Sequence, residues 1–205
     1  QRMQNEHLDM CFFEATVRNE TNHIAWNPDE YSKSHHYKAA AGSTILQQHF
    51  SNNEYSPCVY LYMARRSLIQ SNSIRFQENI LFEDNVFTFR LALASTCCDV
   101  LPQRLYNRRI RSNSIMTRKD DTTRKIDSYK SVIDALHMIP VEPACRKMKN
   151  RYIYSCSAAL LNIAKRDRTR WKSTTGFILS KYLFVKWKMP LKLIKESIAY
   201  IRVRH

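Results

Sequence analysis

The chain has 205 residues, 44% of them hydrophobic and 11% aromatic, so it is long enough to bury a core and does not have the composition of a disordered protein. Its only glycines are Gly42 and Gly176, which excludes a Walker loop and a G-x-G-x-x-G dinucleotide turn, because both need several glycines within a few residues. The formal net charge of +15 attracts polyanions, so the candidate partners are nucleic acid, an anionic membrane surface and a phosphorylated substrate.

The cysteines and the chain start bear on the compartment. The 6 cysteines form no C-x-x-C pair and have no closely spaced histidine, which argues against zinc and predicts a reducing, cytoplasmic environment. We find no signal peptide and no uninterrupted apolar run of about 18 residues, so we expect no membrane span. The start at Gln1, without Met, suggests a fragment or a processed product.

The first part of the chain predicts a mixed α/β organisation. Leu8–Val17 is a short apolar run ending in β-branched residues and predicts a buried strand, and residues 18–41 are polar and predict an irregular excursion. A short amphipathic helix is expected from Gly42 until Ser56-Pro57. Cys58–Ala64 is a second candidate for a buried strand.

The next elements alternate between helix and strand. Asn85–Thr96 repeats apolar residues with a helical period, and the acidic pair Glu83-Asp84 lies at its start, where carboxylates favour the helix dipole. Cys98–Tyr106 is expected to be extended, with Pro102 marking a sheet edge or a bend.

From Thr122 onward the pattern is almost entirely helical. Helices are expected over 122–138, 143–168 with a break, 173–188, and 190–203, the last opened by Pro190. We therefore predict an α/β part over residues 1–117, followed by a basic α-helical region over residues 118–205.

Residues 57–117 carry a specific order of short motifs. A strand ending in Arg65-Arg66 is followed by a short helix, the turn Ile74-Arg75-Phe76, the pair Glu83-Asp84 opening a helix, a strand, and a Y-x-x-R-I-x-x-N-S-I run over Tyr106–Ile115. This layout resembles the bacterial family 2 glycosyltransferases that build capsule, exopolysaccharide or lipopolysaccharide. The resemblance implies the carboxyl-terminal half of an A-type glycosyltransferase fold, with few strands and flanking helices.

The resemblance also implies an activity. Such enzymes transfer a sugar from a nucleotide-sugar donor to a polysaccharide or lipid-linked acceptor, with inversion, and a carboxylate takes the proton of the acceptor hydroxyl. By resemblance Asp84 is this base, and Glu83 orients the acceptor or supports the loop. A base at a helix start is expected to stay ionised, because the helix dipole favours its charged form. The alternative is that Asp84 only caps the helix.

Two pairs of arginines are further candidates. Arg109 and Arg111 alternate on an extended segment, and with Ser114 they correspond to the segment that closes over the donor diphosphate in the resembling enzymes. Many of those enzymes have histidine where this chain has Arg111, which puts a metal-ligand role there in doubt. Arg65 and Arg66 are candidates for acceptor binding. The alternative for both pairs is a solvated basic surface.

The metal site of the resembling enzymes has no counterpart in the sequence. Their D-x-D cluster holds Mg²⁺ or Mn²⁺ against the sugar diphosphate, whereas Asp120-Asp121 falls in a basic, threonine-rich stretch after the resembling block. We expect the D-x-D cluster just before Gln1. The 205 residues would then retain the acceptor side and be inactive alone.

The basic carboxyl-terminal residues and the histidines can also be explained without a functional role. Residues 165–205 hold twelve Lys/Arg against Asp167 and Glu196, and with Trp171 and Trp187 they suit contact with the anionic inner face of the plasma membrane, or form an ordinary solvated face. Histidines 23, 35, 36 and 49 are expected to be surface residues or hydrogen-bonded core residues.

The alternative function is a basic nucleic-acid-binding module. It is supported by tyrosine and arginine interleaved at Tyr106–Arg111 and Arg151–Tyr154. No recognised nucleic-acid motif occurs, however, so no nucleic-acid partner is expected.

Overall fold

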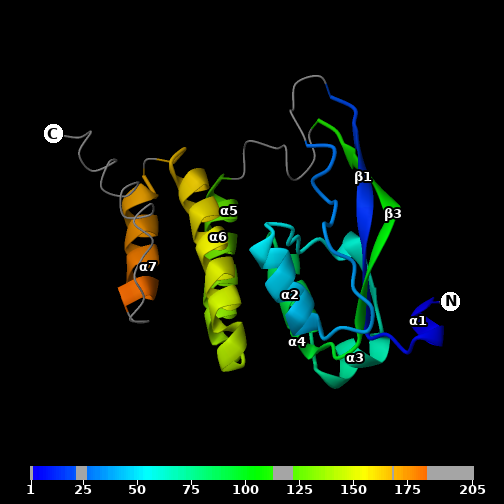
Figure 1. Cartoon of the computed structure of the whole chain (residues 1–205). Helices are drawn as coiled ribbons and strands as arrows, with labels where there is room; N and C mark the ends of the chain where they lie inside the picture. Colours follow the sequence, from blue (N-terminus) through cyan, green and yellow to red (C-terminus); the bar gives the residue numbers. More distant parts are fainter. Residues whose placement is uncertain (1, 22–26, 113–121, 168, 184–205) are drawn as a thin grey trace.

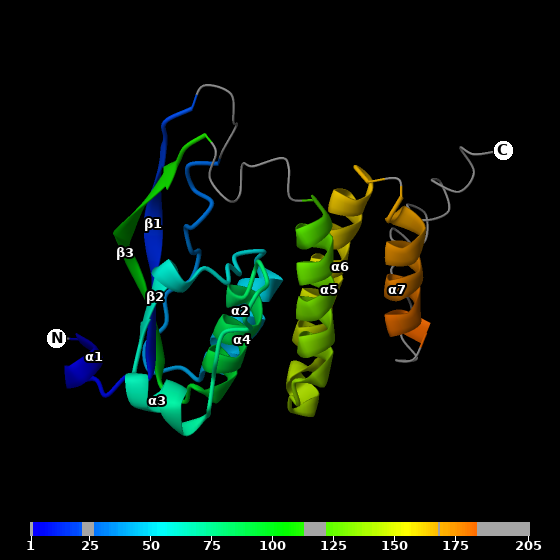
Figure 2. The ribbon, with the colours of Figure 1, turned by 180° about the vertical axis from the view of Figure 1, so that it is seen from behind.

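The computed structural model describes residues 2–21, 27–112, 122–167 and 169–183. Within them a small sheet lies at one side of the molecule, and helices are arranged in layers away from it (Figures 1 and 2). Helices α2 (Gly42–Ser51) and α4 (Asp84–Ala94) lie against the sheet, whereas α5 (Thr122–Met138) and α6 (Arg146–Ala164) form the next layer. Helix α7 (Trp171–Leu183) is outermost.

The sheet has three strands among the described residues, in the order β2-β1-β3. The central strand β1 (Met10–Asn19) pairs antiparallel with β2 (Tyr62–Ala64) and parallel with β3 (Cys98–Ile110). The strand predicted over Leu8–Val17 is thus confirmed, and the first six residues of β1 are all buried because both faces are covered. Phe12 packs in the cluster with the helices, whereas Ala15 packs with Tyr31 and Leu61.

The strand predicted over Cys58–Ala64 is largely wrong. Val59–Leu61 forms a 3₁₀ turn, η1, and only the last three residues of the segment pair with β1. The chain is fixed just before this turn, because Thr88 Oγ1 of α4 donates a hydrogen bond of 2.6 Å to the Pro57 carbonyl. Because Pro57 is held against α4, the chain has to cross to the edge of β1, and pairing with β1 begins only at Tyr62.

The bend expected at Pro102 is confirmed as an irregularity in the β1–β3 ladder. Phe12 pairs with Val100 and Glu14 with Arg104, so Pro102 lies in the stretch where the register shifts. A proline is tolerated there because its missing N–H is not needed by a regular ladder. The strand then continues to Ile110, four residues beyond the predicted Tyr106.

The helices of the α/β part are close to those predicted. In addition to α2 and α4, two short helices form, α1 (Arg2–Asn5) and α3 (Arg66–Ser71). Helix α2 starts against the end of α4: the Gly42 N–H donates to the Ser95 carbonyl, and a Cβ at Gly42 would lie 2.0 Å from the Ala92 carbonyl oxygen. The glycine is required by this close approach of two backbones.

The helical region follows the predicted boundaries closely at its start. Helix α5 has the predicted bounds, and the predicted break in 143–168 is the 3₁₀ turn η2 (Pro143–Cys145) that precedes α6. The helix expected over 173–188 begins at Trp171, and the helix expected over 190–203 lies outside the described residues. None of the described helices is long and apolar enough to cross a bilayer.

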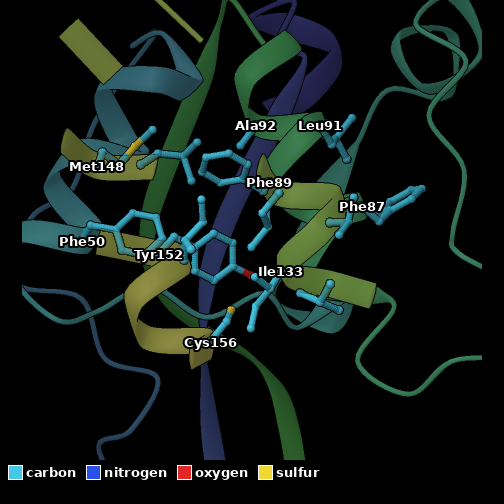
Figure 3. Packing of buried hydrophobic residues seen from close by; sticks show 14 of the residues in the cluster. Phe50, Phe87, Phe89, Leu91, Ala92, Ile133, Met148, Tyr152 and Cys156 are labelled. Carbon is cyan, nitrogen blue, oxygen red and sulfur yellow. The ribbon is translucent and has the colours of Figure 1, made fainter. Parts of the chain in front are cut away.

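One hydrophobic cluster connects the sheet with the helical layers. It contains Phe12 of β1, Ile45 of α2, Phe89 of α4, Tyr152 of α6 and Ile178 of α7. Figure 3 shows part of this packing, with Tyr152 beside Phe50, whose ring centroid is 5.1 Å away. The fold class is confirmed: a mixed α/β fold with a three-stranded sheet flanked by helices.

The packing of α7 corrects one part of the membrane hypothesis. Trp171 is 2% exposed and belongs to the same core, as does Ile178. Their apolar surface is therefore used by the fold and is not available to a bilayer.

Candidate active site

The start of α4 has an unusual backbone. Phe82 has φ 64°, in the left-handed region that a bulky residue seldom adopts, and the side-chain amide of Asn85 donates a hydrogen bond of 2.9 Å to its carbonyl. Glu83 occupies the N-cap position and makes no capping hydrogen bond with its side chain. The turn that presents Asp84 is thus held by Asn85.

The Asp84 carboxylate is half-buried, and Asn85 Nδ2 donates a hydrogen bond of 3.1 Å to its Oδ1. Burial, and after it the neighbouring Glu83 charge, raise the pKa of Asp84, the Asn85 hydrogen bond opposes both, and the resulting pKa is about 6. The position at the helix start predicted that Asp84 stays ionised, but burial disfavours the charged form and raises the pKa. A carboxyl that titrates near neutral pH suits both accepting and releasing a proton.

Four tyrosines lie within range of the Asp84 charge. Burial raises the pKa values of Tyr55, Tyr62, Tyr129 and Tyr152, and the Asp84 charge raises each of them further. For Tyr62 the resulting pKa is about 12. Near neutral pH these hydroxyls therefore keep their protons and can donate hydrogen bonds.

A cavity of about 250 Å³ is lined by three of these tyrosines and by Asn85, the residue after Asp84, and lies between the end of α2, the start of α4, and helices α5 and α6. Its lining consists of aromatic walls and a polar rim, namely His49, Phe50, Asn53, Tyr55, Pro57, Asn85, Tyr129, Arg151, Tyr152, Ser155, Cys156 and Ala159. The rim residues Asn53, Arg151 and Ser155 are exposed, and an Arg151 Nη2 hydrogen bond of 2.9 Å to Asn53 Oδ1 joins α6 to the loop after α2.

His49 is buried in this lining and corrects one expectation. Burial, with the Lys33 charge, lowers the pKa of His49 to about 3, so the ring is neutral. Its Nε2 has no hydrogen-bond partner among the described residues, so it is a core histidine but not a satisfied one. Of the other histidines, His36 Nε2 lies 3.6 Å from Glu14 Oε1, and His23 lies outside the described residues.

The predicted phosphate-binding residues lie away from Asp84. β3 extends past α2 and α4 (Figures 1 and 2), and Arg109 is exposed near its end, with Nε 3.6 Å from Glu20 Oε2. Arg111 is exposed directly after the strand, and Ser114 lies outside the described residues. The structure thus places Arg109 and Arg111 together at one end of the sheet, and their phosphate role stays a prediction.

The predicted acceptor-binding arginines lie at the other end of α4. The Arg65 guanidinium donates to the Leu8 carbonyl at 3.1 Å, and the Arg65 N–H donates to the Asp9 carbonyl. Asp9 in turn holds Thr96, directly after α4, so about 15 Å of helix separates Arg65 from Asp84. Arg66 is exposed at the start of α3. The structure does not bring this pair to Asp84, and its acceptor role stays a prediction.

No group of three or more His, Cys, Asp or Glu side chains in the described part of the chain is placed to hold a metal ion. Asp120 and Asp121 lie outside that part. The described residues therefore do not fit Mg²⁺ or Mn²⁺, and we derive no step through either ion.

Comparison with known proteins decides the fold. No protein-family model matches the chain, and no curated protein matches it. The crystal structure of S. aureus TarS residues 1–349 in complex with UDP-GlcNAc aligns with a TM-score of 0.50 at 17% identity, over 86% of this chain and 50% of that one. TarS is a glycosyltransferase. The fold is a partial glycosyltransferase fold.

Two further TarS structures are similar to the chain. The 1–349 structure in complex with UDP has a TM-score of 0.48 at 15% identity, over 82% of this chain and 42% of that one. The 1–349 structure without a named ligand has a TM-score of 0.46 at 14% identity, over 84% and 43%. The chain thus spans about half the length of the structures that it matches.

Sequence reasoning missed several residues of the site. Asn85 follows the acidic pair directly, but an asparagine in a first helical turn carries no signal of its own. Tyr152 lies 67 residues further on, in a helix with no recognised motif. Arg108, next to the predicted Arg109, lies outside the cavity lining and donates a hydrogen bond of 3.1 Å to the Tyr31 hydroxyl.

Proposed function

We propose that the chain is the acceptor-side, carboxyl-terminal half of an inverting family 2 glycosyltransferase. The observation that carries the proposal is the half-buried Asp84 carboxylate, which titrates near pH 6 beside a cavity lined by tyrosine rings. The glycosyltransferase-like fold also supports the proposal. Within this fold Asp84 is the first residue of α4, the helix that packs between the sheet and the helical layer.

In this proposal the cavity receives the acceptor sugar. Aromatic walls suit the apolar faces of a sugar ring, and the rim of Asn53, Arg151 and Ser155 suits its hydroxyl groups. The volume of about 250 Å³ lies below the usual range of about 300–1,000 Å³ for drug-sized ligands, which favours one terminal sugar over an extended chain.

Asp84 is the general base. Its carboxylate takes the proton of an acceptor hydroxyl while the hydroxyl oxygen forms a bond to the anomeric carbon of the donor sugar. The bond from that carbon to the diphosphate breaks, and the nucleoside diphosphate leaves with the bonding electron pair. The protonated Asp84 then releases its proton to solvent, which a pKa of about 6 permits at neutral pH.

The donor in this proposal is a nucleotide sugar. TarS, the structural neighbour, has been crystallised with UDP-GlcNAc. Arg109, Arg111 and Ser114 are proposed to contact the donor phosphates, since guanidinium groups bind phosphate oxygens in pairs. The Mg²⁺ or Mn²⁺ ligands and the rest of the donor site are proposed to come from outside these residues, so the 205 residues alone would not turn over.

The proposed setting is surface polysaccharide synthesis in the cytoplasm. Lipid-linked acceptors at the inner leaflet would meet an enzyme that is held there by its basic carboxyl-terminal segment. The nucleic-acid alternative has weaker support, because Tyr106, one of its proposed stacking rings, already stacks on Tyr60 with centroids 4.5 Å apart.

Saccharide titration of the isotope-labelled chain tests the proposed acceptor site. Chitobiose, cellobiose and lactose are added in turn, and at least one should shift the NMR signals of Tyr55, Tyr129 and Asn85. Arg151→Ala should weaken the response several-fold, whereas Arg146→Ala, on the same helix but outside the cavity lining, should not. Absence of any response in the cavity would refute the acceptor site, and tight, salt-sensitive oligonucleotide binding would favour the alternative.

A further inference from the structure

Tyr152 of α6 is buried, with 3% of its surface exposed, and its hydroxyl has a hydrogen-bond partner inside the protein. The hydroxyl donates a hydrogen bond of 2.8 Å to Asn85 Oδ1, and it also lies 3.2 Å from the Asn85 carbonyl oxygen. The tyrosine ring is fixed by its neighbours Phe50 and Phe89, with ring centroids 5.1 and 5.2 Å away. A donor on a rigid, packed ring has a defined position.

This contact sets the orientation of the Asn85 side chain. With its oxygen facing Tyr152, the amide directs its NH₂ group to the Phe82 carbonyl at 2.9 Å and to Asp84 Oδ1 at 3.1 Å. The flipped amide would place its oxygen against that carbonyl and that carboxylate, which are acceptors only. Asn85 is itself 8% exposed, so water has little access to satisfy a misdirected amide.

We propose that Tyr152 is a positioning residue for Asp84, acting through the Asn85 side chain. The proposal rests on the assignment of Asp84 as the base, but the three-residue chain of hydrogen bonds stands independently of it. It makes α6, in the helical region, a support for the acidic pair of the α/β part.

The physical effect is on both the direction and the charge of the carboxylate. The Asn85 hydrogen bond favours the ionised form of Asp84, so losing its alignment raises the pKa of Asp84. It also frees the carboxylate to rotate away from the direction that an acceptor hydroxyl would require.

The test measures the pKa of Asp84 in the 205-residue chain by carboxyl ¹³C NMR. Tyr152→Phe removes one buried oxygen and keeps the ring, so the fold should survive, and the pKa of Asp84 should rise by about one unit. Tyr154→Phe, two residues along the same helix, is the matched control and should leave the pKa of Asp84 unchanged. Asn85→Ala, with Asn85→Ser as a second variant at that position, should raise the pKa of Asp84 by a similar amount.

The double variant Tyr152→Phe, Asn85→Ala shows whether Tyr152 acts through Asn85 or affects the packing around Asp84 in general. If Tyr152 acts through Asn85, Tyr152→Phe should add nothing to the pKa of Asp84 in the Asn85→Ala background. An unchanged pKa of Asp84 in Tyr152→Phe, or a shift that persists without the Asn85 amide, would overturn the proposal. Because no turnover is measured, these results stand whether or not Asp84 proves to be a catalytic base.

Discussion

Asp84 is held where burial opposes its charge, and this has a consequence for stability. Its pKa is about 6 in the folded chain against the ordinary aspartate value of 3.8, so the folded state binds the Asp84 proton more tightly than the unfolded state does. The resulting stabilisation is complete below about pH 4 and is lost as pH rises through about 6.

Asp84→Asn removes this titration and keeps the shape of the side chain. Relative to the parent, the variant should gain about 1–3 kcal/mol of unfolding free energy between pH 4 and pH 7.5, since a shift of one pKa unit corresponds to about 1.4 kcal/mol. Denaturant unfolding of both proteins at the two pH values measures the gain. An equal difference in unfolding free energy at both pH values would show that Asp84 does not titrate as described.

Glu83 acts on its neighbour through charge. Because its carboxylate raises the pKa of Asp84, Glu83→Gln should lower the pKa of Asp84 towards the value set by burial and the hydrogen bonds to Asp84. Carboxyl ¹³C titration of Asp84 in this variant measures the shift. Glu78→Gln, an exposed change on the preceding loop, serves as the control. A pKa of Asp84 that rises or stays fixed in Glu83→Gln would assign Glu83 no electrostatic role.

At the residue scale, the sequence located the acidic pair but not its surroundings. Motif order singles out Glu83 and Asp84, whereas the direction of the Asp84 pKa shift depends on side chains packed over it from other elements. Asn85 and Tyr152 are joined only by folding, because 67 positions separate them in the sequence. The sequence likewise does not show that His49 Nε2 lacks a hydrogen-bond partner among the residues that the structure describes.

At the element scale, the two glycines offer a matched pair of substitutions. Gly42→Ala should destabilise the chain by about 1–3 kcal/mol or more, because the added Cβ would meet the Ala92 carbonyl oxygen at 2.0 Å. At Gly176 in α7 an added Cβ would meet no heavy atom of the described residues within 4 Å, so Gly176→Ala should stabilise the helix by about 0.5–1 kcal/mol. Thermal unfolding of both variants tests the packing of α2 against α4, and a harmless Gly42→Ala would contradict that packing.

Element prediction succeeded where local pattern and tertiary packing agree. The helix α5 was predicted with its observed bounds, and one of its faces is buried from Ile126 to Leu136. Cys58–Ala64 was misassigned because its apolar composition suits a strand, whereas the hydrogen bond from Thr88 to the Pro57 carbonyl delays pairing until Tyr62. That contact joins residues 31 positions apart and leaves no trace in the local sequence.

At the scale of the whole molecule, the membrane role proposed for the basic carboxyl-terminal end is tested by a truncation that keeps α7. Residues 184–205 lie outside the described part of the chain, whereas α7 before them supplies Trp171 and Ile178 to the core. Removing 184–205 leaves Trp171 and Ile178 in the chain and should abolish binding to vesicles that contain anionic lipid, and thermal unfolding of the truncated chain checks that it is still folded.

Salt is the control for that experiment. Binding of the full chain should fade as the Debye length falls below about 8 Å, because the attraction is electrostatic. Vesicles of neutral lipid should bind neither chain. Equal binding by the truncated chain would reject the membrane role of this segment.

The central claim is that Asp84 is the base of a glycosyl transfer, and the most direct measurement is the transfer rate of the Asp84→Asn variant. The chain is assayed joined to a donor-binding half, with the parent and Asp84→Asn compared at saturating nucleotide sugar. We expect turnover to fall by about 10²–10⁴-fold with donor affinity unchanged, since the base contacts the acceptor hydroxyl and not the nucleotide. Turnover by Asp84→Asn at the parent rate would contradict the account.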